Sequence, residues 1–308
     1  MKQISGYVGA FIAVAGLAFV ARELARHVDD IRVALGTLPL ATIPLSLLVG
    51  SLGMLTIGSG WRACLRLLGT DPPVLATLRS YYVGQLGKYV PGGIWPVVGR
   101  AEMARRQGIP GQTSYGSTLL SLGLTYLAAA LTAVAGLFMT AAPVGAFPLV
   151  AVAILGVGIS ALHPRAIRIA LDLLQRVSRR QVALPIPTWR RSVKLLLLHV
   201  PAWLAIGAAT WILGVALDPG TPSFTNVLFA TSLAWLIGFV AIPVPGGLGV
   251  REAVFVATAT SFTTLGTASA VAVLARVVFI AVDLLGAGTT NLLTVGARRH
   301  ATRSTEDL

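Results

Sequence analysis

Two proline–glycine runs mark the places where this chain could do chemistry. One run begins at Pro91 and the other at Pro245, and each interrupts an apolar segment in a different half of the chain. Proline removes a backbone donor and glycine permits turn conformations, so we predict that a helix stops at each run and leaves N–H groups unpaired. Half-helix N-termini of this kind, near 96–98 and 247–250, favour an anion through their donors and their dipole.

Charged side chains follow both runs at short spacing. An arginine and a glutamate come after each run: Arg100 and Glu102 in the first half, Arg251 and Glu252 in the second. A guanidinium group binds phosphate through two parallel hydrogen bonds, so a phosphate headgroup is the ligand that the pattern favours. The predicted substrate-binding residues are Lys88, Arg100, Glu102, Arg251, Glu252, Arg276 and Asp283, and the helix breaks expected to line the site are Pro91, Gly92, Gly93, Pro245, Gly246 and Gly247.

A purely structural ion network is the alternative. The arginine and glutamate after each run are two positions or one position apart, so they do not share a helix face. Arg276 and Asp283 are seven positions apart, about 10 Å along a helix, which is too far for contact. Each charge then needs a partner on another segment, and we expect pairs such as Glu252–Arg276 and Lys88–Glu102. A network that only holds helices together and one that also lines a translocation path both stay open.

The composition places these charges in a membrane protein. Hydrophobic residues make up 55% of the chain and charged residues 11%, with a mean hydropathy of +0.80, which excludes an ordinary soluble domain. The net charge of +13 comes mainly from arginines between apolar segments, which is typical of positive-inside topology and not of nucleic-acid binding. Four scattered histidines, one cysteine and the lack of a nucleotide-binding motif predict no metal, no cofactor and no enzymatic activity.

The apolar segments predict an all-α integral membrane protein with about six full transmembrane helices, each near the ~20 residues of a bilayer crossing. Two broken re-entrant hairpins are expected to enter from opposite faces as an inverted repeat. One polytopic membrane domain then covers 1–308: a first half (1–162), a basic cytoplasmic loop (163–194), a second half (195–296) and a cytoplasmic tail (297–308). The expected spans are 4–22, 39–61, 113–139, 144–162, 192–217 and 267–296, and the expected hairpins are 74–106 and 225–262.

Both motifs resemble one known family. The segment 84–96 followed by Arg100, and the segment 243–252 followed by a span with Arg276, are similar to the lysylphosphatidylglycerol synthase transmembrane-region family of flippase-like membrane domains. The resemblance covers nearly the whole chain, and it implies that the protein moves or presents polar-headed lipids such as aminoacylated phospholipids, polyprenyl-phosphate sugars, related glycolipids or hopanoids. Because the chain stops at Leu308, we expect the membrane module without the soluble aminoacyltransferase domain.

Together these features predict a lipid flippase or transporter in the bacterial plasma membrane, with both termini cytoplasmic. Its substrate is expected to be an anionic or phosphate-linked membrane lipid, and its expected partner a glycosyltransferase or lipid synthase. The alternative is a membrane-embedded lipid transferase, or an accessory subunit of a glycosyl- or aminoacyltransferase. An enzyme would need a general base, for which Glu102, Glu252 and Asp283 are the candidates.

Overall fold

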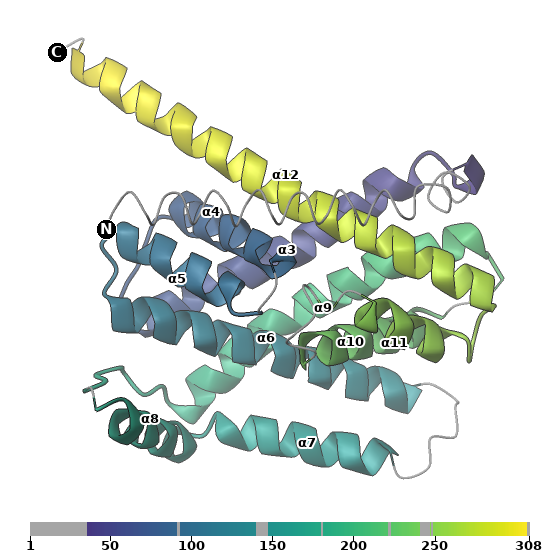
Figure 1. The fold of residues 1–308 in the computed structure, drawn as a ribbon, viewed down its shortest axis with the longest axis horizontal. Coiled ribbons are helices and arrows are strands. Elements are labelled where there is room, and N and C mark those ends of the chain that lie inside the picture. Colours follow the sequence, from purple (N-terminus) through teal and green to yellow (C-terminus); the bar gives the residue numbers. More distant parts are fainter. Residues whose placement is uncertain are drawn as a thin grey trace.

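Every regular element in the described part of the chain is a helix (Figure 1). The computed structural model describes residues 36–90, 93–139, 147–179, 181–220, 223–240, 247 and 249–306. The helices are α3 (Thr42–Leu67), α4 (Val74–Gln85), the 3-10 helix η1 (Leu86–Tyr89), α5 (Trp95–Arg106), α6 (Gly111–Met139), α7 (Phe147–Ala161), α8 (Pro164–Ser178), α9 (Trp189–Leu217), α10 (Phe224–Val240), α11 (Val250–Ala259) and α12 (Leu265–Glu306).

Four of these helices are long and apolar enough to cross a membrane: α3, α6, α9 and the Leu265–Gly296 part of α12. The shortest, α3, has 26 residues, about 39 Å of helix, which exceeds the ~30 Å of a hydrocarbon core. A fifth span is reached only if α7 and α8 are joined across a bend of 76°. The chain is therefore a multi-pass helical membrane protein.

The expected number of six full spans is not confirmed. The first of them, 4–22, lies outside the described residues. The expected span 144–162 corresponds to α7, which has 15 residues and is shorter than a crossing by itself. The described part of the chain thus supports four spans, or five with the bent pair.

The centre of the helix bundle is the contact between α3 and α9, the most extensive one in the described ranges. A Cβ added at Gly53 of α3 would lie 3.0 Å from the carbonyl oxygen of Ala202 in α9, which is the close small-residue packing typical of membrane helices. The next side chain, Trp203, is buried, and its Nε1 donates a hydrogen bond to the carbonyl oxygen of Thr125 in α6, at 2.7 Å. This bond ties a third helix to the central pair.

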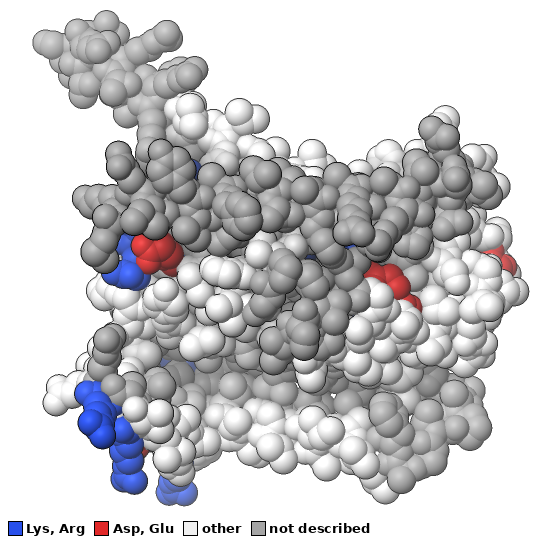
Figure 2. All heavy atoms as spheres, viewed as in Figure 1, with Lys and Arg blue, Asp and Glu red and all other residues white. Residues whose placement is uncertain are grey.

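The outer surface of the long helices is apolar, and basic side chains gather at one edge. Leu48, Leu149 and Leu292 are examples of well exposed aliphatic side chains. On the face that Figure 2 shows, most of the described surface is uncharged, and Lys and Arg atoms gather at the left edge, the side on which Figure 1 shows α8. An apolar belt with basic residues at one end is what a bilayer and the positive-inside rule require.

Two helical hairpins flank the central pair within the predicted broken segments. The first consists of α4, η1 and α5, and the second of α10 and α11. In Figure 1, α4 and α5 lie on the left of the bundle, whereas α10 and α11 lie right of its centre. Gly93 and Gly247 have φ angles of +63° and +67°, which glycine adopts most readily. The four other break residues, Pro91, Gly92, Pro245 and Gly246, lie outside the described residues.

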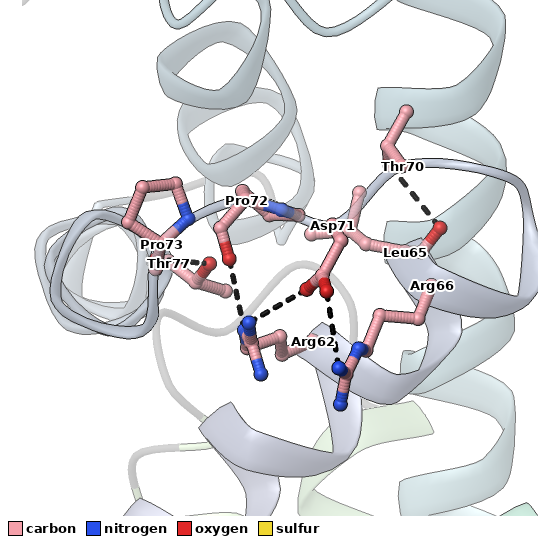
Figure 3. A network of polar contacts seen from close by, with 8 residues as sticks. All are labelled: Arg62, Leu65, Arg66, Thr70, Asp71, Pro72, Pro73 and Thr77. Atoms are coloured by element: carbon pink, nitrogen blue, oxygen red, sulfur yellow. Dashed lines mark hydrogen bonds and ion pairs between the residues drawn. The ribbon is translucent and has the colours of Figure 1, made fainter.

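A polar network fixes the turn that leads into the first hairpin (Figure 3). Arg62 at the end of α3 contacts the Asp71 carboxylate at 2.6 Å and donates through Nε to the Pro72 carbonyl oxygen at 2.9 Å. Arg66 reaches the other oxygen of the same carboxylate at 3.0 Å. The two arginines therefore hold the turn before α4.

Candidate functional site

Arg251 lies at the start of α11 and stacks on aromatic rings. Its guanidinium carbon is 3.6 Å from the centre of the Trp235 ring and 5.7 Å from that of Phe279. The Glu252 carboxylate accepts a hydrogen bond from the Gly249 N–H at 2.7 Å, which satisfies one of the unpaired donors of the first turn and fixes where the helix begins. No carboxylate among the described residues lies within ion-pair distance of Arg251.

The second oxygen of the Glu252 carboxylate binds the last span. Glu252 Oε1 contacts Arg276 Nη1 on α12 at 2.9 Å, and the Arg276 side chain is 9% exposed. This is the pair expected from the sequence, and it is confirmed. One carboxylate therefore both caps α11 and joins the second hairpin to α12.

A second buried ion pair joins the first hairpin to the same helix. Lys88 Nζ, at the end of η1, lies 2.5 Å from Asp283 Oδ2, and the Tyr89 hydroxyl donates to the same oxygen at 2.6 Å. The ammonium also lies 5.6 Å from the centre of the Trp235 ring. Because Trp235 also stacks on Arg251, the end of η1 and the second hairpin meet at one tryptophan.

The predicted pairing of Lys88 with Glu102 is wrong. Glu102 lies on the outward side of α5 and pairs with Arg105 at 3.0 Å and Arg106 at 3.7 Å, with 37% of its side chain exposed. Those partners are three and four positions further along the helix, the spacing that brings side chains onto one face. Glu102 therefore lies apart from the buried ion pairs described above and is removed from the candidate site.

Arg100 occupies a buried site in the first hairpin. It is 3% exposed, its guanidinium carbon lies 4.6 Å from the Tyr81 ring centre and 5.4 Å from that of Trp61, and Nη2 donates to Gln85 Oε1 at 3.0 Å. Its Nε has no hydrogen-bond partner in the described part of the chain, and no carboxylate there pairs with it. A buried guanidinium in this state is expensive unless an anion can reach it.

The two hairpins repeat one sequence pattern. An aromatic residue is followed three positions later by a glycine, and the proline–glycine run begins seven positions after that glycine. The residues are Tyr81, Gly84 and Pro91 in the first hairpin and Trp235, Gly238 and Pro245 in the second. In each hairpin the aromatic ring of this pattern stacks on the site arginine.

The glycine of the pattern has the same structural role in both hairpins. A Cβ on Gly84 would lie 3.0 Å from the Arg100 Cβ, and one on Gly238 would lie 3.1 Å from the Arg251 Cβ. Only a residue without a side chain lets the two arms approach this closely. The glycine thus sets how far each arginine lies from the ring on the opposite arm.

A small cavity lies beside the second arginine. It is lined by Thr210, Thr231, Ala234, Trp235, Arg251, Glu252, Phe255, Ala272 and Ala275, with about 20 Å³ open to water-sized molecules. That is room for about one water molecule and too little for a phosphate group. Thr231 Oγ1 and Trp235 Nε1 are buried and have no hydrogen-bond partner among the described residues.

The interior cluster carries excess positive charge. It contains four cations and two anions, so its net charge is +2: Lys88, Arg100, Arg251 and Arg276 against Glu252 and Asp283. The two anions pair with Lys88 and Arg276, so neither stacked arginine has a carboxylate partner among the described residues. Within the described ranges, His, Cys, Asp and Glu form no group of three that could hold a metal ion.

A comparison with known families identifies the family of the chain. A family model described as the lysylphosphatidylglycerol synthase TM region matches residues 7–286. The chain belongs to this family. The match includes both hairpins and all interior charges of the candidate site, so the lysylphosphatidylglycerol synthase TM region is the module that carries them. No curated protein matches the chain.

Sequence reasoning missed the aromatic and hydroxyl partners of the charges. Tyr89, Trp235 and Tyr81 contact the charged groups directly. The repeated aromatic–glycine spacing before each break was the signal that could have identified Tyr81 and Trp235. Tyr89 had no comparable signal, because its partner Asp283 is 194 positions away.

Proposed function

We propose that this protein is a lipid flippase or transporter that moves or presents a polar-headed, phosphate-bearing lipid across the bilayer. The observation that carries the proposal is the pair of stacked arginines, Arg100 and Arg251, which have no carboxylate partner in the described part of the chain. Intramembrane charges of this kind mark substrate pathways by default. Membership of a family named for a lipid synthase supports a lipid as the substrate.

The chemistry around Arg251 suits a phosphate better than other headgroup features. Stacking on Trp235 holds the guanidinium plane and leaves its N–H edge for a bidentate contact with phosphate oxygens. Thr231 and Trp235 add two donors beside the same cavity that have no partner among the described residues. Cations in excess of anions would compensate the charge of the headgroup as it leaves water.

We propose that the structure is a closed state, because the cavity is small. A space for about one water molecule cannot hold a headgroup, so the hairpins must move apart before a lipid enters. We propose that they are re-entrant and related as an inverted repeat, and that each arginine serves substrate from one side of the bilayer. The repeated aromatic–glycine–proline spacing and the placement of the hairpins in the bundle (Figure 1) support this arrangement.

The alternative of a membrane-embedded transferase, or of an accessory subunit, is less well supported. A general base requires a carboxylate that is available to take a proton, whereas Glu252 and Asp283 each bind a cation. We therefore propose that the protein is not an enzyme and needs no cofactor. A partner glycosyltransferase or lipid synthase would supply or consume the transported lipid.

We propose that the protein resides in a bacterial plasma membrane with both termini in the cytoplasm. The basic segment at α8 and the arginines at the end of α5 would then lie at the cytoplasmic surface. This orientation makes the first hairpin enter from the cytoplasm and the second from outside.

The decisive experiment measures headgroup movement in reconstituted vesicles. A fluorescent phosphatidylglycerol probe and a membrane-impermeant quencher would report the rate for wild type, Arg251→Gln and Arg251→Lys. Charge-assisted hydrogen bonds contribute about 1.5–3 kcal/mol. Their loss in Arg251→Gln predicts that the headgroup moves about 10- to 100-fold more slowly. Arg251→Lys keeps the charge but not the planar fork, so we expect an intermediate rate.

The matched control is Arg66→Gln, which removes an arginine from an exposed turn where the side chain is 57% exposed. It should leave the transport rate unchanged. A wild-type rate in a folded Arg251→Gln variant would show that this arginine only packs against Trp235, and the structural interpretation of the ion network would then hold.

A further inference from the structure

A short helix outside the candidate site has the geometry of a membrane-surface element. The chain bends by 76° between α7 and α8. If α7 lies along the bilayer normal, this bend directs α8 close to the membrane plane. Helix α8 packs only lightly on α7, and His163 caps its start by accepting a hydrogen bond from the Arg165 N–H at 3.2 Å. Figure 1 shows α8 at the lower left, at the edge of the bundle.

One face of α8 is apolar and exposed. Ile169, Leu173 and Val177 are 61%, 54% and 84% exposed. They are four positions apart, so they form one stripe along the helix. Exposed aliphatic side chains on a helix with basic neighbours are the signature of a helix lying in the membrane interface.

A basic stripe runs beside the apolar one. At about 100° per residue, the charged positions fall on one side of the helix next to the apolar stripe. The stripe contains four arginines and one aspartate, so its net charge is +3: Arg165, Arg168, Arg176 and Arg179 against Asp172. All five side chains are exposed, and the blue atoms at the lower left of Figure 2 lie where Figure 1 shows this helix.

An open pocket lies at the C-terminal end of α8. Arg179 ends the helix with φ +52°, and the chain turns so that Gln181 closes one side. The pocket has about 380 Å³ of space and is lined by Asp172, Gln175, Arg176, Arg179 and Gln181. Its two arginines and the Gln181 amide are donors, whereas the Gln175 amide donates to the Val182 carbonyl oxygen at 3.0 Å, and its size is that of a small-molecule site.

We propose that α8 binds anionic phospholipids at the membrane surface, with a headgroup phosphate in the pocket of Arg176 and Arg179. The apolar stripe enters the acyl boundary, while the basic stripe contacts neighbouring headgroups. The positive stripe selects anionic over zwitterionic lipid. This binding surface is separate from the interior arginines and does not depend on transport.

The test places a nitroxide on α8 in the full-length protein. A label at Val177→Cys reports depth by its relative accessibility to oxygen and to a water-soluble nickel chelate, since the native cysteine, Cys64, is buried. Vesicles of phosphatidylcholine alone are compared with vesicles that contain about one third phosphatidylglycerol. We expect the label in the acyl boundary only when the anionic lipid is present.

Removal of two arginines tests the headgroup contact. Arg176→Gln with Arg179→Gln should weaken docking about 30-fold, because each arginine near an anionic surface contributes about a factor of five. The matched control is Arg190→Gln with Arg191→Gln, which removes the same charge from exposed positions at the start of α9 and should leave the depth unchanged. High salt should reproduce the loss in the unmodified labelled protein.

Three outcomes would overturn the proposal. The label could stay in water in both kinds of vesicle, it could reach the same depth in phosphatidylcholine alone, or the control pair could weaken docking as much as the α8 pair. The salt titration keeps the test independent of whether the double variant folds.

Discussion

The buried pair of Lys88 and Asp283 fixes the broken end of the first hairpin on α12. A double-mutant cycle can measure the coupling free energy between the two residues. Asp283 is fully buried and the Lys88 side chain is 18% exposed, with 2.5 Å between Nζ and Oδ2. Removal of one partner leaves a buried charge without compensation, which costs about 3–5 kcal/mol. We therefore expect Asp283→Leu and Lys88→Met each to lose about that much stability.

The double variant should lose far less stability than the sum of the losses in the two single variants. Replacing a buried ion pair with apolar residues of similar volume is often neutral or favourable, although the Tyr89 hydroxyl would lose its acceptor at a cost of about 1–3 kcal/mol. The expected coupling between the two positions is thus at least about 3 kcal/mol.

Unfolding by sodium dodecyl sulfate in mixed micelles gives the free energies for the cycle. Tyr89→Phe is the control, because it removes only the hydroxyl that contacts Asp283 at 2.6 Å; it should cost about 1.5–3 kcal/mol. Additive losses in the Lys88 and Asp283 double variant would refute the reasoning, because they would mean that neither charge depends on the other.

Two further predictions concern the hairpins. Gly84→Ala puts a Cβ 2.9 Å from the Arg100 backbone nitrogen, and we expect it to destabilise the protein by about 1–3 kcal/mol in the same unfolding assay. The control is Gly123→Ala, whose Cβ would have no atom within 4 Å and should not destabilise the protein. Equal losses of stability in the two variants would contradict the close approach of the hairpin arms. Glu102→Gln should change stability by less than about 1 kcal/mol and leave transport unaffected. Glu252→Gln should impair both stability and transport, because its partner Arg276 is buried. If the two variants behaved alike, the placement of Glu252 inside the site and of Glu102 outside it would be contradicted.

The sequence predicted the hairpin bounds well because the signals there are local. The first hairpin was expected at 74–106 and is formed by helices over 74–85 and 95–106, and the second was expected at 225–262 and is formed by helices over 224–240 and 250–259. Glycine and proline act on their own backbone and immediate neighbours, so their effect can be located without knowledge of the fold.

The partners of the charges could be predicted only in part. The Glu252–Arg276 pair was predicted from spacing, because neighbouring Arg251 and Glu252 do not share a helix face and Asp283 lies about 10 Å from Arg276 along the helix. Glu102 was misplaced because its ordinary pairs with Arg105 and Arg106 were overlooked in favour of a distant lysine. The true partner of Lys88 is Asp283, 195 positions away, and no spacing rule connects two helices whose packing is unknown. Whether these residues bind substrate stays a prediction.

The stacked arginines have a thermodynamic consequence. Arg100 is buried and has no carboxylate partner among the described residues, so an anionic ligand that bound it would stabilise the folded state through linkage. Occupancy at a hundred times the dissociation constant would add about 2.7 kcal/mol. A library of lipid headgroup analogues could therefore be ranked by melting temperature alone, which would test the proposed lipid substrate without a transport assay.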